Sequence, residues 1–399
     1  MPLPVVTLKP GHVQPVWAGH PWVFQQAIAG ATGGARPGDL VAVHDPRGTF
    51  LGKGLYSPGS ALAVRILTRD ERQEIDGEFF RERVRQALDR RAALHLPCAD
   101  TNAYRLVHAE GDGLPGLIVD VFDDVAVVQL GSLGMKLREG LVFEAIDAAL
   151  SPRAILDRTS AEMAKREGFE PSRGVVRGDP SAGVLAFRER GFAFSLPEEL
   201  GQKTGFYFDQ RPLRARVEQL SRGATVLDAF AFIGTFSLAA ARGGAREVTA
   251  CDASALALEV GAETARANGL ADRVRWVRGD AREALAKAGA EGGRDLVICD
   301  PPKLAPSRGK REAALSMYRR LAEAGAAATR PGGLLVFCSC SAAVKLDDLV
   351  RALALGADAA GRTAVVLERH FQGADHPVLA AFPEGLYLKS LIARIERRR

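Results

Sequence analysis

The C-terminal half of the chain alternates strand-like and helix-like segments, and this pattern limits the possible folds more than any other feature. Short apolar runs predict strands at residues 225–228, 247–251, 274–277, 295–299, 334–338 and 364–369. Segments rich in Ala, Leu, Arg and Glu separate these runs and are typical of helices. Such alternation favours a doubly wound, mostly parallel sheet with helices on both faces. We therefore predict an α/β fold from about residue 200 onward.

The N-terminal half has a different pattern. Residues 1–72 contain short apolar runs that Gly or Pro interrupts every few residues, as in a small β-barrel. Residues 73–190 combine a long charged helical stretch, a second helix and hairpin-like strands, which indicates a small α+β domain. A chain of 399 residues is long for a single hydrophobic core. We predict three domains, at residues 1–72, 73–190 and 191–399.

Composition narrows the functional classes only modestly. A formal net charge of +5 fits an anionic partner such as nucleic acid, but it is also common in proteins without one. The five cysteines form no CxxC motif and no Cys/His cluster with zinc spacing, so no metal site is predicted. The apolar runs are too short or too broken to span a membrane, and the N-terminus lacks a secretory pattern. We expect a reduced, cytoplasmic protein with no membrane partner.

Acidic residues follow four of the predicted strands. They are Asp228, Asp252, Asp280 and Asp300. Ligands of doubly wound sheets bind at the carboxyl ends of the strands, so these four side chains should meet at one edge. An acid in this position can also cap the helix that follows, so any one of these residues taken alone could have either role. Four in series favour a ligand site.

The loop after the first of these strands distinguishes between cofactors. It contains only Gly234 and lacks the GxGxxG pattern that lets a backbone approach a pyrophosphate, which disfavours a dinucleotide. Asp252 follows about 20 residues later, where an acid binds ribose hydroxyls. A positively charged nucleoside without phosphate, such as S-adenosylmethionine (SAM), fits better. We expect Asp252 to bind its ribose, Asp280 its adenine amino group and Asp228 its methionine ammonium.

Several motifs resemble those of a known family. VLDAFAFIGTFSLAAA, VTACDAS, VICDPPKLAPSR and CSCS resemble, in this order, the class I SAM-dependent methyltransferases. KTGFYFDQR, ADHPVLAAFPEGLYLK, the N-terminal HPWVF and the central EGDGLPGLIVDVF resemble more closely the RlmI-type large-subunit rRNA cytosine-5 methyltransferases. DPPK alone is shared by several methyltransferase families, whereas the combined set is specific and covers nearly the whole chain.

The resemblance implies a specific architecture and a set of cofactor contacts. It implies an N-terminal PUA domain, a small α+β domain and a Rossmann-like methyltransferase domain, whose seventh strand is antiparallel and lies near the C-terminus. It places the cofactor beside Phe208, Asp209, Gln210 and Arg211, and we add Phe230 and Pro301 as predicted contacts. RNA, specifically 23S rRNA, would be the partner, and the resemblance leaves a homodimer open.

The segment LLVFCSCS raises the question of what its two cysteines do. Carbon-5 of cytosine is a poor nucleophile until a thiolate adds to carbon-6, so this methylation needs a cysteine near the methyl group. The resemblance places that nucleophile at Cys340. Extended backbone points Cys338 and Cys340 to the same side, but Cys338 lies deeper in the apolar strand, where burial keeps a thiol inert. Metal ligation and a disulfide between the two are disfavoured because partner ligands are absent and the bridge would be strained.

Asp300 could complete the chemistry by holding the ring edge of cytosine at N3 while the thiolate adds. Two alternatives remain open at this point. One is a guanine N-methyltransferase acting on rRNA, since DPP-type loops also serve amino-group methylation. The other is an RNA-binding ribosome assembly factor that has kept the fold and lost catalysis; the acids at the strand ends argue against this loss.

Overall fold

The structure is a computed structural model that describes residues 2–179, 181, 183–200, 205–305 and 308–398. It divides into two compact units. The first contains Met1–Phe208 together with Ala374–Gly385, and the second contains Asp209–Gly373 together with Leu386–Arg399. Parts of two quoted motifs, Lys203-Thr204 and Pro306-Ser307, lie outside the described residues.

The first unit begins with a six-stranded sheet in the order β2-β6-β5-β4-β1-β3. Its strands are β1 (Val5–Leu8), β2 (Trp22–Phe24), β3 (Ile28–Thr32), β4 (Leu40–His44), β5 (Phe50–Tyr56) and β6 (Leu62–Thr68). The short helix α1 (Gln14–Trp17) lies between β1 and β2. Apolar side chains from these elements form a core of their own, in which Val6, Val41 and Val64 are fully buried.

The second part of the first unit is the predicted α+β region. Its sheet has the order β11-β10-β9-β8-β7. The strands are β7 (Ala103–His108), β8 (Leu117–Phe122), β9 (Val125–Leu130), β10 (Ala154–Asp157) and β11 (Gly174–Gly178), and the hairpin β12 (Leu185–Glu189) and β13 (Phe192–Leu196) follows. The helices are α2 (Gly77–Ala92), α3 (Leu133–Lys136), α4 (Glu139–Leu150) and α5 (Ala161–Glu167). Phe80, Val119 and Ile146 are buried together where α2 and α4 cover this sheet.

The second unit contains one seven-stranded sheet in the order β16-β15-β14-β17-β18-β20-β19. The strands are β14 (Thr225–Asp228), β15 (Glu247–Asp252), β16 (Val274–Arg278), β17 (Arg294–Cys299), β18 (Thr329–Ser339), β19 (Arg362–Phe371) and β20 (Lys389–Arg397). The pairs among β14 to β18 are parallel, whereas β20 runs antiparallel to both β18 and β19. All six predicted strands are present, and the antiparallel seventh strand is confirmed.

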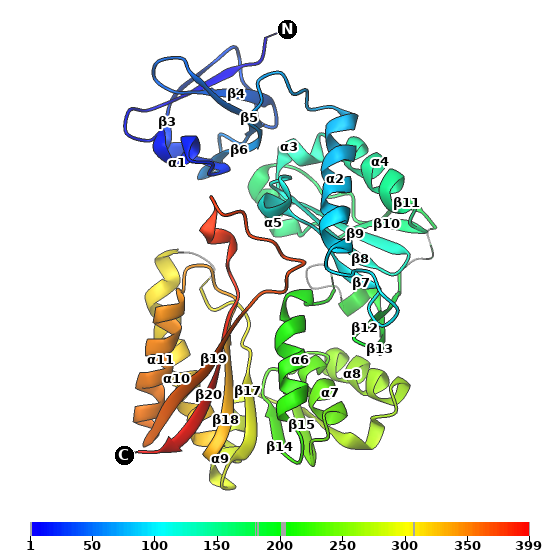
Figure 1. Cartoon of the computed structure of the whole chain (residues 1–399), viewed down its shortest axis with the longest axis vertical. Helices are drawn as coiled ribbons and strands as arrows, with labels where there is room; N and C mark the ends of the chain where they lie inside the picture. Colours follow the sequence, from blue (N-terminus) through cyan, green and yellow to red (C-terminus); the bar gives the residue numbers. More distant parts are fainter. Residues whose placement is uncertain (1, 180, 182, 201–204, 306–307, 399) are drawn as a thin grey trace. The chain divides into compact units, whose positions relative to one another are not determined.

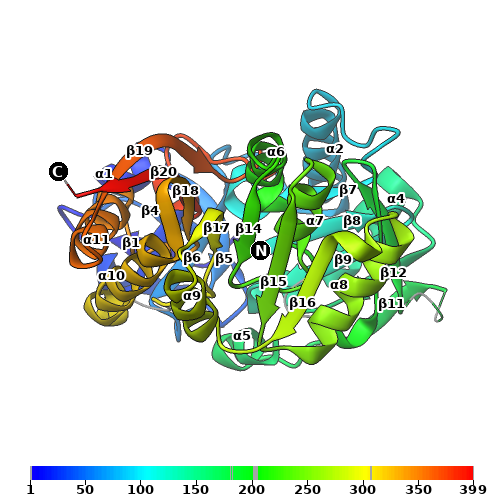
Figure 2. The same ribbon diagram turned by 90° about the horizontal axis from the view of Figure 1, so that it is seen from below.

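Helices cover both faces of this sheet, as Figures 1 and 2 show. They are α6 (Arg211–Leu220), α7 (Thr235–Arg242), α8 (Ala255–Ala267), α9 (Ala281–Ala290), α10 (Arg311–Ala328) and α11 (Leu346–Ala359). On one face, α9, α10 and α11 pack against Val297 and Phe337. On the other face, α6 and α7 pack against Ile298 and Cys338. Two buried faces explain why the strands appear in the sequence as continuous apolar runs.

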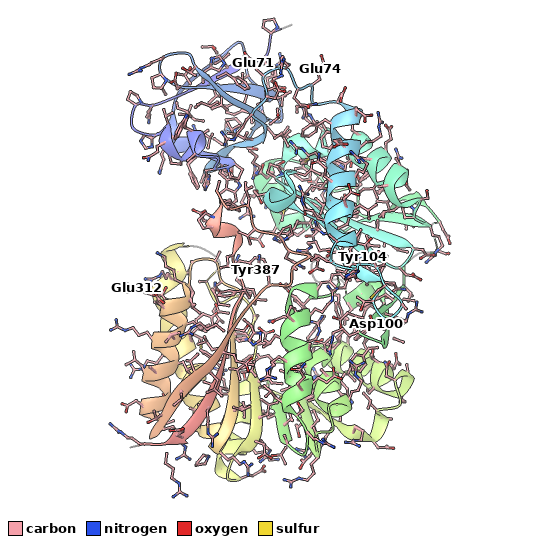
Figure 3. The ribbon with its side chains drawn as sticks, viewed as in Figure 1. Glu71, Glu74, Asp100, Tyr104, Glu312 and Tyr387 are labelled. Carbon is pink, nitrogen blue, oxygen red and sulfur yellow. The ribbon has the colours of Figure 1, made fainter. Side chains whose placement is uncertain are left out.

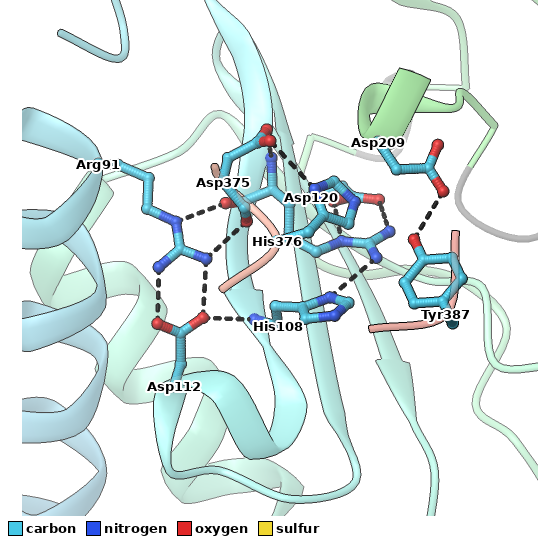
Figure 4. A network of polar contacts seen from close by, with 9 residues as sticks. Arg91, His108, Asp112, Asp120, Asp209, Asp375, His376 and Tyr387 are labelled. Atoms are coloured by element: carbon cyan, nitrogen blue, oxygen red, sulfur yellow. Dashed lines mark hydrogen bonds and ion pairs between the residues drawn. The ribbon is translucent and has the colours of Figure 1, made fainter. Parts of the chain in front are cut away.

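One segment leaves the second unit and returns to it. After β19 the chain contributes Ala374–Gly385 to the first unit and re-enters the second unit at Leu386. Within the first unit, buried Arg91 donates to both carboxylate oxygens of Asp112 at 2.6 and 2.7 Å and to the Asp375 carbonyl oxygen at 2.8 Å (Figure 4). The Asp375 side chain accepts from the Arg105 backbone N–H. These contacts fix a part of the C-terminal sequence in the core of the N-terminal unit.

No helix among the described residues is long and apolar enough to cross a membrane.

Candidate active site

The first acid of the predicted site, Asp228, ends β14 and is completely buried. Its Oδ2 accepts a 2.8 Å hydrogen bond from the Ser237 hydroxyl on α7, while its Oδ1 has no partner among the described residues. Burial raises the pKa of Asp228 to about 7, the Ser237 hydrogen bond opposes this, and the charges of Asp300 and Asp252 add to it. An unpartnered buried carboxylate oxygen is costly, and a cationic ligand group would relieve it.

Asp252 ends β15 and closes the loop that follows β14. Its two carboxylate oxygens accept from the backbone N–H groups of Phe232 and Ser254, at 2.8 and 2.9 Å. The electrostatic influence of Asp252 and Asp300 on Asp228 shows that the structure brings these three acids together. Each oxygen of Asp252 retains a further lone pair, so the carboxylate can still accept from ligand hydroxyls.

Gly234 is required by the same loop for two reasons. It is the N-cap of α7 with a left-handed φ of 70°, which favours glycine. A Cβ at this position would also lie 2.5 Å from Cη2 of Trp276 on β16. The Trp276 ring comes equally close to a Cβ placed on Gly261 of α8. Sequence reasoning missed Trp276, although an aromatic residue in a predicted strand next to a glycine loop was an available signal.

Asp280 caps a helix, which is the alternative to ligand binding that any of the four acids allowed. It is the N-cap of α9, accepts from the backbone N–H groups of Arg282 and Glu283, and pairs with the Arg282 side chain at 3.0 Å. These hydrogen bonds, the Arg282 side chain first, lower the pKa of Asp280 to about 2. Its proposed contact with adenine stays a prediction.

The boundary between the two units falls just before α6, between Phe208 and Asp209. Phe208 belongs to the first unit, where it is buried against Phe122, Phe187 and Phe206. In the second unit, buried Asp209 accepts a 2.6 Å hydrogen bond from the Tyr387 hydroxyl, a residue labelled in Figures 3 and 4.

Three other predicted residues lie on nearby elements of the second unit. Gln210 donates from Nε2 to Asp300 Oδ2 at 2.9 Å, which links the start of α6 to the loop after β17. Arg211 is the first residue of α6 and is half-buried. Phe230 is half-buried and packs against the core beneath α9, α10 and α11, and Pro301 is buried beside Asp300. The direct contacts that these residues make with a cofactor stay predictions.

The two cysteines of CSCS have different environments. Cys338 lies inside β18 and is fully buried; burial, with the Asp300 charge next, raises its pKa well above the ordinary value for a thiol. Cys340 lies one residue beyond the end of β18 and is partly exposed. Cys299 is also fully buried, and burial raises its pKa strongly. Of these three cysteines, Cys340 alone combines a loop position with solvent access.

The loop around Cys340 is held by its neighbour, Ser341. The Ser341 hydroxyl accepts from the Ala305 backbone N–H at 3.1 Å and lies 3.3 Å from the Tyr318 hydroxyl on α10. Its carbonyl oxygen accepts from Lys389 Nζ on β20 at 2.8 Å. These bonds connect CSCS to the DPPK loop, to α10 and to the antiparallel strand. No local sequence pattern indicates that Tyr318 or Lys389 lies here.

A pair of histidines interacts within the first unit. His376, which is buried, and His108, which is half-buried, belong to the first unit, where His376 Nδ1 bonds to Asp375 at 3.0 Å. Burial, and secondly His376, lowers the His108 pKa well below its usual value. Among the described residues, no group of three or more His, Cys, Asp or Glu side chains could hold a metal ion.

Comparisons with known proteins identify the kinds of domain that the chain contains. A family model described as a PUA-like domain matches residues 6–69, and one described as an S-adenosylmethionine-dependent methyltransferase matches residues 169–376. The Ribosomal RNA large subunit methyltransferase I of Alteromonas mediterranea is 38% identical over 392 residues, covering 98% of each chain. The protein of the same name from Pseudoalteromonas translucida is 36% identical, covering 98% of this chain and 99% of its own.

This chain belongs to the ribosomal RNA large subunit methyltransferase I family. It carries a PUA-like domain and an SAM-dependent methyltransferase domain, and SAM is its cofactor. Solved structures agree on the fold: SMU.776, a methyltransferase in complex with SAH, superposes with a TM-score of 0.85 at 18% identity, covering 98% of this chain and 99% of that chain. An SAM-dependent methyltransferase from Streptococcus mutans superposes with a TM-score of 0.84 at 18% identity over the same shares.

Proposed function

We propose that this member of the family transfers a methyl group from SAM to carbon-5 of a cytosine in large-subunit rRNA, through a covalent adduct with Cys340. The names of its relatives, which match nearly the whole chain at 34–38% identity, support rRNA as the substrate. The PUA-like domain supports an RNA partner. The position of Cys340 is the observation that carries the choice of chemistry, because amino-group methylation needs no cysteine at the end of β18.

The cofactor site is assigned to the acids at the carboxyl edge of the sheet. Asp228 has a buried oxygen that no described residue contacts by a hydrogen bond, which fits the methionine ammonium, and Asp252 keeps lone pairs for the ribose hydroxyls. Gly234 allows the chain to turn tightly at the start of α7. Bound SAM supplies an electrophilic methyl group on a positively charged sulfur.

The chain's own residues supply the activation of the base. The Cys340 thiolate adds to carbon-6 of cytosine, and the electrons of the 5,6 double bond move so that carbon-5 becomes nucleophilic. Asp300, whose Oδ2 accepts a 2.9 Å hydrogen bond from Gln210, is assigned to N3 in its protonated form. It donates its proton to N3 as negative charge develops there during the addition, and takes the proton back when carbon-5 attacks the methyl group. After carbon-5 has accepted the methyl group, its proton passes to water, the electrons of that C–H bond re-form the 5,6 double bond, and the thiolate leaves with the electrons of its bond to carbon-6, which restores the aromatic ring. The target base must leave its stack to reach this site.

The test is methyl transfer from labelled SAM to unmodified rRNA, followed by nucleoside analysis, for the wild type and two cysteine variants. The wild type should produce 5-methylcytidine and Cys340→Ala should produce none. Cys338→Ala is the matched control: it removes a thiol two residues away that is buried and has a raised pKa, so it should retain activity. Label on guanosine, or full activity of Cys340→Ala, would contradict the proposal. Absence of any transfer by the wild type, with SAM bound, would favour the assembly-factor alternative.

A further inference from the structure

Lys389 occupies an unusual position for a lysine. It is the first residue of β20 and pairs with Ser339, the last residue of β18. Only 4% of its surface is exposed. Its ammonium group donates to the carbonyl oxygens of Ser341 and Tyr387, at 2.8 and 2.7 Å. Lys389 Nζ therefore lies beside the backbone that immediately follows Cys340.

This buried cation has no carboxylate partner among the described residues. The two carbonyl oxygens are its hydrogen-bond acceptors, and it forms no ion pair with any residue that the structure describes. Asp348 on α11 influences it weakly, but the Asp348 carboxylate is already engaged by the Arg311 guanidinium at 2.6 Å and by the Lys345 backbone N–H. A charge buried without a counter-ion is costly, so a lysine in this place needs an anion from another group.

The group that can supply this anion is Cys340. Burial lowers the pKa of Lys389 to about 8, and the strongest effect in the opposite direction is the negative charge of Cys340, followed by that of Asp348. A cation stabilises a neighbouring thiolate as strongly as the thiolate stabilises the cation. Cationic neighbours are a general means of activating catalytic thiols.

We propose that Lys389 is a positioning residue that acts through Cys340: its ammonium is the counter-ion of the Cys340 thiolate, and its two hydrogen bonds fix the loop that presents the thiolate. The inference deepens the proposed function and rests on it for the role of Cys340. The proton balance is closed, because an ammonium with a thiolate holds as many protons as an amine with a thiol. When the thiolate adds to carbon-6 its charge passes to the base, and it regains that charge on leaving.

Other ionisable groups face this pair. Tyr318 on α10 interacts electrostatically with Cys340 and Asp300, and burial raises its pKa, so it is neutral over the working range. Asp300, as a carboxylate, would disfavour a thiolate nearby. Lys389 is the cation that offsets this repulsion at Cys340.

The experiment measures alkylation of Cys340 by iodoacetamide as a function of pH, without RNA. Rates are followed by mass spectrometry of the Cys340 peptide in a Cys98→Ser background, because Cys98 is exposed and would react as well. Lys389→Gln removes the charge and keeps hydrogen-bond donors, whereas Lys389→Arg keeps the charge. Lys287→Met, which removes an exposed lysine of α9, is the control for the loss of one positive charge.

The wild-type midpoint should lie below about 8.5, the value of an ordinary cysteine. In Lys389→Gln it should rise by at least about one pH unit, which makes alkylation at neutral pH about tenfold slower. Lys389→Arg should restore the wild-type profile, and Lys287→Met should leave it unchanged. An equal midpoint in the wild type and in a folded Lys389→Gln variant would overturn the proposal. If the variants do not fold, a wild-type midpoint at or above that of an ordinary cysteine overturns it on its own.

This experiment separates the inference from the proposed function. If the midpoint shifts as expected but the protein forms no 5-methylcytidine, the lysine–thiolate pair is supported and the assigned reaction is contradicted. If the protein forms 5-methylcytidine but the midpoint is the same in the wild type and in Lys389→Gln, the reaction is supported and the role of Lys389 is contradicted.

Discussion

Replacing Asp228 by Asn should stabilise the second unit at alkaline pH in the absence of cofactor. The carboxylate is completely buried at the end of β14; one oxygen accepts from the Ser237 hydroxyl, and the other has no partner in the described part of the chain. Burial is the main reason that its pKa rises to about 7. Asn has nearly the same shape but carries no charge, so the variant avoids the cost of ionising a group in this position.

The sign and size of the effect follow from the pKa. Because the folded state holds the Asp228 proton more tightly than the unfolded chain, the stability that this group contributes is complete below about pH 4 and is lost as the pH rises through about 7. Raising the pKa from 3.8 to about 7 corresponds to about 4 kcal/mol of lost stability above pH 7. Between pH 5 and pH 8, the equilibrium constant for opening of the wild type should therefore increase about 100-fold relative to that of the variant.

Hydrogen–deuterium exchange followed by mass spectrometry can measure this difference within the second unit. At each pH, the exchange rates of peptides from β14 and β15 are compared between the wild type and Asp228→Asn, so that the intrinsic pH dependence of exchange cancels. Peptides from β8 and β9, in the first unit, serve as the internal control and should not differ.

Two results would refute this reasoning. One is a ratio of exchange rates that stays constant from pH 5 to pH 8. The other is a variant that opens increasingly more readily than the wild type as the pH rises, which would mean that the ionised carboxylate stabilises the folded state without cofactor.

Three further predictions concern the cofactor loop and the buried ion pair. Calorimetry should show that SAM binds the wild type about tenfold more tightly per pH unit up to about pH 7, where Asp228 becomes ionised, and that Asp228→Asn removes this dependence. Gly234→Ala should destabilise the second unit by about 2–4 kcal/mol in denaturant unfolding, because it adds a steric clash to backbone strain. Gly269→Ala, with a similar φ and open space around it, should cost only about 1–2 kcal/mol. Asp112→Ala should destabilise the first unit by about 3–5 kcal/mol, because it leaves a buried guanidinium unpaired; an effect below 1 kcal/mol by the same measurement would contradict this.

The parts of the fold that could be predicted are those specified by local patterns. The strands β14, β15, β17 and β18 were predictable because burial on both faces requires continuous apolar runs. The sequence also showed that each acid could be either a ligand contact or a helix cap, but it did not show which acid has which role. Asp228 and Asp280 both end a strand or begin a helix in the sequence, yet one is fully buried and the other caps α9 at the surface. Depth beneath the surface depends on packing, which local sequence does not encode.

The features that could not be predicted depend on contacts between distant residues. Nothing near Asp375 indicates that the chain between β19 and β20 enters the first unit, because its partners Arg91 and Arg105 are more than 200 positions away. Lys389 likewise begins an ordinary apolar strand. Its importance arises only from the register that places it opposite Ser339, next to the CSCS loop. The motif at Cys340 was recognisable, whereas the groups that support it were not.

Trapping with a fluorinated substrate tests the covalent mechanism most directly. An rRNA fragment containing 5-fluorocytidine would accept the Cys340 thiolate at carbon-6 and the methyl group at carbon-5, but fluorine cannot leave as a cation, so the adduct should persist. We expect a covalent protein–RNA complex that depends on SAM, maps by mass spectrometry to Cys340, survives Cys338→Ala and is absent in Cys340→Ala. A complex that maps to another residue, or no complex from a protein that methylates cytosine, would contradict it.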